Sequence, residues 1–130
     1  VKYFYGLVRQ DGDSAFGVEF PDLPGCFSAS DDADGIVANA IEALKLWFED
    51  MPDVEPSSIS ELQAEARDAI AEGAVFVRVP FIGSAGKSQR VNITIDDAVL
   101  AAVDRAASER QLSRSAFLAE AARREIERTA

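Results

Sequence analysis

The decisive stretch of this sequence is QRVNITI at residues 89–95. Its polar and β-branched side chains alternate, so the two sets face opposite sides of an extended chain. Strict alternation of this kind predicts a half-buried β-strand. Asp96 and Ser113 are N-cap residue types, and each precedes a stretch with apolar side chains at helical spacing. The sequence therefore predicts a strand followed by two helices, over about 96–110 and 113–128.

A unit of one strand and two helices is too small to fold alone. Segments of about 40 residues usually need disulfides, metals or oligomerisation, and a lone strand leaves its backbone hydrogen-bonding groups unpaired. Antiparallel pairing with the same strand of a second chain would remove both problems. It would give a two-fold dimer with a two-stranded ribbon over four helices. The residues predicted to form the dimer core are Val91, Ile93, Ile95, Val103 and Phe117.

The polar side chains of such a ribbon would project outward together. A two-stranded ribbon fits the DNA major groove, where Arg pairs with guanine, Asn pairs with adenine and the Thr methyl group meets thymine. The residues predicted to contact bases are Arg90, Asn92 and Thr94. A helix N-terminus binds phosphate, and the predicted phosphate-binding residues are Lys87, Ser113, Arg114 and Ser115. The alternative is an amphipathic strand whose polar face only meets solvent; the order of strand, helix, Ser-capped turn and helix favours DNA binding over it.

The charge of the chain is divided unevenly. Its 130 residues include 13 Lys and Arg and 23 Asp and Glu, a net charge of −10. Residues 1–86 hold 5 of the basic and 16 of the acidic side chains, whereas residues 87–130 hold 8 and 7. Small and polar residues at 83–88 predict a linker between domains at 1–82 and 89–130. The acidic N-terminal lobe would repel nucleic acid and attract a basic protein surface, unless its charge serves only solubility.

The N-terminal lobe carries a succession of strand and turn signals. Strands are expected at about 3–8, 15–20, 26–30 and 74–81, with a hairpin turn at Asp11-Gly12 and a rigid turn around its Pro-Gly pair at 24–25. Helical spacing of apolar residues predicts a helix over 34–50, followed by a shorter helical stretch over 60–71. This order predicts an α+β fold with the helices on one face of the sheet.

Composition excludes several kinds of active site. The sequence has no His, which removes His-based catalytic and metal sites, and its one cysteine, Cys26, cannot form an intrachain disulfide. Cys26 is expected to be a small buried residue, because no basic side chain lies within five residues to lower its pKa. We predict no catalytic residue, no metal and no cofactor. No apolar run is long enough to span a bilayer, and the expected location is the cytoplasm.

The N-terminal lobe contains a group of carboxylates of the kind that a metal-dependent nuclease would need to bind its metal. Three of them stand just before the predicted helix, where N-capping and the positive end of the helix explain them. We therefore expect capping rather than catalysis from this group, which consists of Asp22, Asp31, Asp32, Asp34 and Glu42.

The segment at 90–123 resembles the ribbon-helix-helix family of bacterial DNA-binding proteins; it runs RVNITIDDAVLAAVDRAASERQLSRSAFLAEAAR. Gln111 stands where that family commonly has Gly at the turn, so the glutamine would have to take the left-handed conformation. The front of the chain is similar to the HicB family of antitoxins, through VEFPDLPGCF at 18–27 and ANAIEAL at 38–44. It departs from that family at 30–34, where SDDAD replaces a Gly-Asp-Thr-like turn.

The HicB resemblance implies an N-terminal lobe built like a degraded ribonuclease H fold. In that family the lobe blocks HicA, a small basic toxin that cleaves messenger RNA, and the C-terminal domain binds the promoter of the operon. The resulting hypothesis is a non-enzymatic antitoxin and repressor. Its expected partners are a HicA-like toxin, operator DNA and a second copy of the chain, in a dimer or a dimer of dimers. The alternatives are a ribbon-helix-helix regulator with a ligand-sensing N-terminal lobe, and a metal-dependent nuclease.

Overall fold

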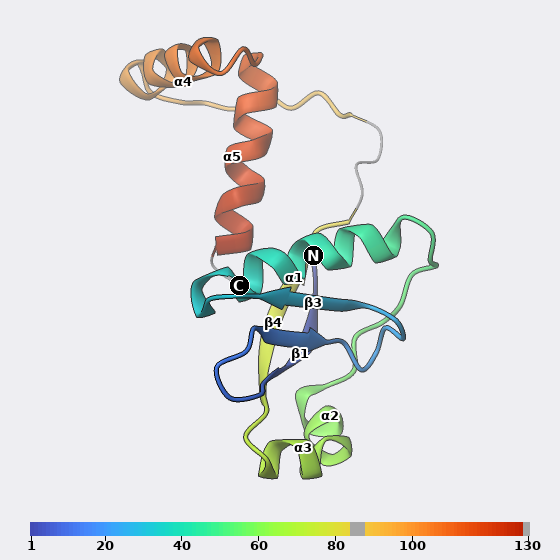
Figure 1. Ribbon diagram of the computed structural model, residues 1–130. Helices are drawn as coiled ribbons and strands as arrows, with labels where there is room; N and C mark the ends of the chain where they lie inside the picture. The colour runs from blue at the N-terminus through green and yellow to red at the C-terminus, as the bar shows by residue number, and fades with distance from the viewer. Residues whose placement is uncertain (84–87, 129–130) are drawn as a thin grey trace. The chain divides into compact units, whose positions relative to one another are not determined.

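The chain separates into two units, Val1–Ser84 and Ala85–Ala130. The structure, a computed structural model, describes residues 1–83 and 88–128 (Figure 1). The N-terminal unit holds a four-stranded sheet and its helices, and the C-terminal unit holds two further helices. None of the helices in the described ranges is long and apolar enough to cross a membrane.

The sheet of the N-terminal unit is antiparallel throughout and has the order β3-β2-β1-β4. Its strands are β1 (Lys2–Gln10), β2 (Phe16–Glu19), β3 (Phe27–Ser30) and β4 (Val75–Phe81). The Asp11-Gly12 turn joins β1 to β2 as predicted, and the Ser14 amide donates to the Asp11 carbonyl over 3.1 Å. The first and last strands pair along seven residue pairs, from Lys2–Phe81 to Val8–Val75, which places β4 at an edge of the sheet beside β1.

The main core lies between one face of this sheet and α1 (Ile36–Phe48), which a short 3-10 turn, η1 (Ala33–Gly35), introduces. The predicted apolar stripe is confirmed, because Ala40, Ile41 and Leu44 are buried against the sheet. Phe48 at the end of α1 stacks on Phe81 of β4, with ring centres 4.3 Å apart. Gly6 of β1 leaves room in the same core for the Val18 side chain of β2, because a Cβ at Gly6 would lie 2.6 Å from that side chain.

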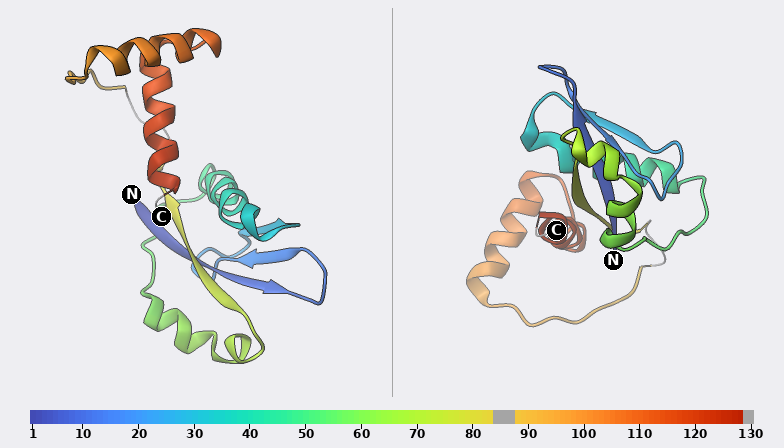
Figure 2. Two further views of the ribbon diagram at one scale, coloured as in Figure 1. Left: turned by 90° about the vertical axis from the view of Figure 1, so that its left-hand side faces the viewer. Right: turned by 90° about the horizontal axis from the view of Figure 1, so that it is seen from below.

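The prediction that the helices share one face of the sheet is wrong. Two short helices, α2 (Ile59–Glu65) and α3 (Arg67–Ala71), lie on the face opposite α1 (Figure 2). Leu62 of α2 is buried there, outside the core that α1 covers. The predicted single helical stretch also breaks at Ala66, whose backbone leaves the helical region at φ −96° and ψ 18°. The sheet is therefore the middle layer of three.

The C-terminal unit contains the two predicted helices, α4 (Asp97–Glu109) and α5 (Arg114–Arg128). Their predicted N-caps are present, because Asp96 Oδ1 accepts from the Val99 amide over 2.8 Å and Ser113 Oγ accepts from the Ala116 amide over 3.1 Å. Residues 88–96 form neither a strand nor a helix in the single chain. A strand exists only through hydrogen bonds to a neighbouring strand, and within the described residues of this unit there is no second strand to supply them.

Candidate nucleic-acid interface

The segment with alternating side chains is exposed on both of its sides. Arg90, Asn92 and Thr94 are exposed, as expected of residues that would contact bases. Their apolar neighbours Val91 and Ile93 are also exposed, at 71% and 62%. Large β-branched side chains at such exposure form an apolar surface of the kind that proteins use to bind other molecules.

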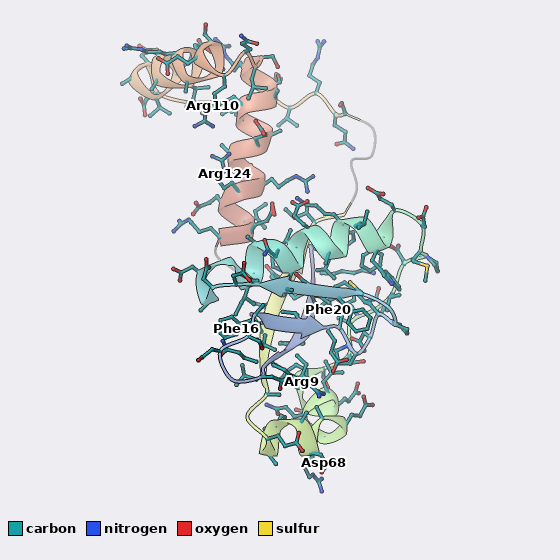
Figure 3. The ribbon with its side chains drawn as sticks, in the orientation of Figure 1. Arg9, Phe16, Phe20, Asp68, Arg110 and Arg124 are labelled. Carbon is teal, nitrogen blue, oxygen red and sulfur yellow. The ribbon has the colours of Figure 1, made fainter. Side chains whose placement is uncertain are left out.

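The residues predicted to form the dimer core differ in how far they are buried in the single chain. Val103 is buried at 8% exposure, and Phe117 and Ile95 are half-buried. Arg110 stands at the corner between α4 and α5 (Figure 3), with its guanidinium carbon 5.5 Å from the centre of the Phe117 ring. Among the described hydrophobic residues of the unit, only Val103 and Ala107 are buried. Two residues make a small core, so the helices alone provide little hydrophobic stabilisation.

The turn between the helices is a left-handed cap at Gln111. Its φ is +58°, which confirms the conformation expected where related sequences have glycine. The Gln111 amide donates to the Ser108 carbonyl over 3.1 Å, and the Leu112 amide donates to the Ala107 carbonyl over 2.8 Å. These two bonds are the 5→2 and 6→1 bonds of a Schellman motif, which satisfies the last carbonyls of α4. They fix the direction in which α5 leaves α4.

Of the four residues predicted to hold phosphate, Ser113 and Arg114 are engaged within the unit. Ser113 caps α5. The guanidinium of Arg114 donates from Nε to Asp104 Oδ1 and from Nη2 to Asp104 Oδ2, both over 2.8 Å, and this pair joins α5 to α4. The pair lowers the pKa of the Asp104 carboxyl and raises the pKa of Arg114. Ser115 is exposed in the first turn of α5, and Lys87 lies outside the described residues.

Asp104 is the residue of this site that the sequence analysis missed. It stands ten positions before Arg114 in the chain, and only the angle between the two helices brings the carboxylate to the guanidinium. A bidentate pair uses two of the five N–H donors of arginine. The guanidinium therefore has a fixed plane and retains N–H groups for another anion.

Of the five carboxylates considered above as nuclease ligands, Asp22 and Asp32 act in local structure. Asp22 accepts from the Ser57 amide over 2.8 Å and from the Ser57 hydroxyl over 2.7 Å, which ties the proline turn to the loop before α2. Asp32 caps η1 by accepting from the Gly35 amide over 2.9 Å, as the sequence predicts. Asp31, Asp34 and Glu42 are exposed. The described residues contain no group of three or more His, Cys, Asp or Glu side chains arranged to hold a metal.

Cys26 lies in the core beneath α1, at 3% exposure. Burial raises the pKa of its thiol to about 11. A thiol with so high a pKa stays protonated at neutral pH and is a poor nucleophile. The prediction of a small buried residue is therefore confirmed.

A family model described as the HicB-like antitoxin of bacterial toxin–antitoxin systems matches residues 4–122, which include both units. The chain belongs to this HicB-like antitoxin family. It is 30% identical over 127 residues to an uncharacterised 14.9 kDa protein from the rep-hol intergenic region of Haemophilus phage HP1, over 91% of this chain and 93% of that protein.

Solved HicB antitoxins have a similar structure. The Burkholderia pseudomallei antitoxin HicB matches all of this chain and all of its own, at 29% identity and a TM-score of 0.54. Antitoxin HicB3 matches 95% of this chain and 97% of its own, at 26% identity and a TM-score of 0.54. A chain of the HicA3–HicB3 toxin–antitoxin complex has a similar fold over 62% of this chain, at 22% identity and a TM-score of 0.51.

The left-handed cap at Gln111 leads to a stability prediction for the C-terminal unit of this HicB-like antitoxin. Gln111→Gly should stabilise the unit by about 0.5–1 kcal/mol, because glycine takes a positive φ without the steric cost that a Cβ imposes. The matched control is Ala102→Gly, at an exposed position inside α4, which should destabilise the unit by about 1 kcal/mol. Thermal denaturation followed by circular dichroism would compare the two. Equal destabilisation by both changes would contradict the assignment of the cap.

Proposed function

We propose that this chain neutralises a HicA-like toxin with its N-terminal unit and represses its own operon by binding promoter DNA with its C-terminal unit. The proposal rests on the family match across both units and on the exposed apolar side of residues 88–96. Both activities are binding, and we propose no catalytic step. Promoter DNA and messenger RNA lie in the bacterial cytoplasm, so this is where the protein would act.

We propose that two chains pair through residues 89–95 to form the ribbon of a ribbon-helix-helix dimer. Antiparallel pairing would satisfy the backbone groups of both segments. It would also turn Val91, Ile93 and Ile95 of each chain toward the helices, where Val103 and Phe117 start a core that is incomplete in one chain. Burial of large β-branched side chains contributes about 1.5–3 kcal/mol each, so the added core is substantial for a unit of this size.

We propose that the outer side of the ribbon contacts bases and that the start of α5 contacts phosphate. Pairing would bring the Arg90, Asn92 and Thr94 side chains of both chains onto one surface that fits the major groove. Arg114 would reach phosphate with the N–H groups that Asp104 leaves available. Phosphate contacts also come from free amides in the first turn of a helix, here at Ser113 to Ser115, and Lys87 would add a positive charge.

We propose that the N-terminal unit is the toxin-binding part, with a reduced ribonuclease-H-like fold. Residues 1–86 carry a formal charge of −11, from 16 acidic and 5 basic side chains. Such a surface attracts a small basic RNA-binding protein and accelerates its association. The engagement of Asp22 and Asp32 in local hydrogen bonds supports a binding role rather than metal-dependent cleavage.

The dimer can be tested by placing a charge in the apolar side of the ribbon. Ile93→Asp should dissociate the dimer, because it would bury an unpaired carboxylate at a cost of several kcal/mol. Light scattering on the full chain at micromolar concentration would give the mass. The control is Asn92→Asp, which adds the same charge on the outer side and should leave the mass unchanged. A wild-type protein that is monomeric at that concentration would refute the ribbon.

DNA recognition can be tested by comparing operator with random DNA. Asn92→Ala should lose about 1–3 kcal/mol of binding free energy on the operator and little on random DNA, because it removes a contact to a base. Arg114→Ala should weaken binding to both and lower the salt dependence, because it removes a contact to phosphate. Fluorescence anisotropy at several salt concentrations would measure both variants. Equal weakening on both DNAs by Asn92→Ala would rule out the ribbon as the specificity surface.

Toxin binding can be tested by co-expression with the product of the neighbouring reading frame. A small basic product should co-purify with the full chain, and the full chain should restore growth of cells that express it. A truncation after residue 82 should still bind, though less tightly where dimer avidity contributes. A truncation that is folded by circular dichroism and fails to bind would contradict the division of roles. Absence of any binding by the full chain would favour a regulator with a ligand-sensing lobe.

A further inference from the structure

The two edges of the N-terminal sheet differ in how their backbone groups are satisfied. β3 and β4 are the edge strands. At the β3 edge, Asn39 of α1 donates from its side-chain amide to the Ala29 carbonyl over 2.9 Å. At the β4 edge, the described part of the unit supplies no further strand. An open edge is a template for pairing with another polypeptide, so β4 is the edge to consider.

Pro80 shows which groups of β4 point outward. It is paired with Tyr3 of β1, yet proline has no N–H to donate to that partner. Paired residues in an antiparallel ladder alternate between hydrogen-bonded and non-hydrogen-bonded pairs. The backbone groups of Pro80, and of Arg78 and Phe76 at the same phase, therefore face away from β1.

The opposite side of the sheet gives the same phase independently. The Phe20 amide donates to the Cys26 carbonyl, and Asn39 binds the Ala29 carbonyl, which faces outward from β3. Because the backbone groups of Phe20 face β3, those of its neighbour Glu19 face β1 and bond Leu7. The backbone groups of Leu7 therefore face β2, and those of its β4 partner Phe76 face outward. Pro80 is itself buried, so the accessible part of the edge is the stretch from Val75 to Arg78.

A groove lies beside this part of the edge. It has a volume of about 370 Å³, and it is bounded by β4, by Tyr5 of β1 and by α2 and α3. Its lining includes Ile70, a large apolar residue of α3 that remains 38% exposed; the Val75 side chain, 60% exposed, lies on the α1 face of the sheet with its partner Val8. A strand added to β4 would place alternate side chains over this groove, as in the recognition of extended peptides by sheet edges.

Charge determines what kind of strand fits. The α2–α3 segment that walls the groove, residues 59–72, carries four acidic side chains and one basic one. Asp68 is one of these acidic side chains, and it lies on α3 (Figure 3). A second copy of the unit would bring another charge of −11 to the same place, and like charges oppose that contact. Among the residues that line the groove, Arg78 is the charged one, so the preference for a basic extended segment comes from the acidic α2–α3 segment around the groove and from the charge of the whole unit.

We infer that the β4 edge and its groove bind an extended, basic segment of the partner protein by strand addition. The inference deepens the proposed function, because it places toxin binding on Val75 to Arg78 and on Ile70, opposite α1. The main-chain bonds would come from the outward groups of Phe76 and Arg78, and an apolar side chain of the partner would enter the groove.

One outward N–H can be removed without disturbing the sheet. Arg78→Pro deletes the Arg78 donor, which makes no bond to β1, and prolines are accepted at outward positions of an edge strand. The matched control is Arg78→Ala. Both variants lose the charge and the stacking of the guanidinium 3.6 Å above the Tyr3 ring, but only the proline lacks the N–H. The product of the neighbouring reading frame is first separated from its complex with the chain and refolded. Its binding to each full-length variant is then measured by biolayer interferometry. We expect Arg78→Pro to weaken binding at least tenfold relative to Arg78→Ala.

A second pair of variants tests the groove without changing the strand. Ile70→Lys places a positive charge in the groove, and Leu46→Lys makes the same change at an exposed position, 67%, on α1. Ile70→Lys should weaken binding at least tenfold and Leu46→Lys less than threefold. Equal effects of the two lysines, or equal binding by Arg78→Pro and Arg78→Ala, would overturn the β4 site while toxin binding itself stands. Failure of the wild-type chain to bind would instead refute the proposed function. A change of oligomeric mass in Arg78→Pro, but not in Arg78→Ala, would show that a second copy occupies the edge and would also overturn the inference.

Discussion

The backbone of an extended segment must find hydrogen-bond partners, and this requirement governs both units. In the C-terminal unit, residues 88–96 have the alternation of a strand but no neighbouring strand in the described chain. Unpaired backbone groups remain exposed to water or pair with another chain; they are not buried alone. The apolar side of the segment and the small core between α4 and α5 also lack apolar surface to pack against. A second copy of the chain, as proposed above, would satisfy both the backbone and the side chains.

The N-terminal unit satisfies the backbone groups of its sheet, or removes them, in three ways. The inner strands pair with each other, the β3 edge receives the Asn39 side chain, and the far end of β4 has a proline where a donor would face outward. Short edges, prolines and side-chain caps are the means by which proteins prevent unwanted strand addition. The stretch from Val75 to Arg78 has none of these. Within β4, the unprotected stretch therefore lies beside the groove that α2 and α3 bound.

Local signals in the sequence were sufficient for most of the fold. Asp96 and Ser113 mark helix starts because an N-cap depends on a few neighbouring residues, and the stripe on α1 follows from its own periodicity. The left-handed turn at Gln111 was expected from its place after α4. What could not be predicted depends on angles between elements: the break at Ala66, the layer of α2 and α3, and the pairing of Arg114 with Asp104. The predicted strand at 89–95 would need a neighbouring strand to pair with, and the described residues of the C-terminal unit contain none.

The two units differ strongly in charge. The N-terminal part has 16 acidic and 5 basic side chains, and the part from residue 87 onward is nearly balanced. If the C-terminal unit binds DNA as proposed, the acidic unit joined to it would lower the affinity of the whole protein for DNA, because its field opposes the phosphates. A basic partner bound to the acidic unit would cancel part of that field. Under the proposed function, occupation of the N-terminal unit would reduce this electrostatic repulsion and so favour DNA binding by the C-terminal unit.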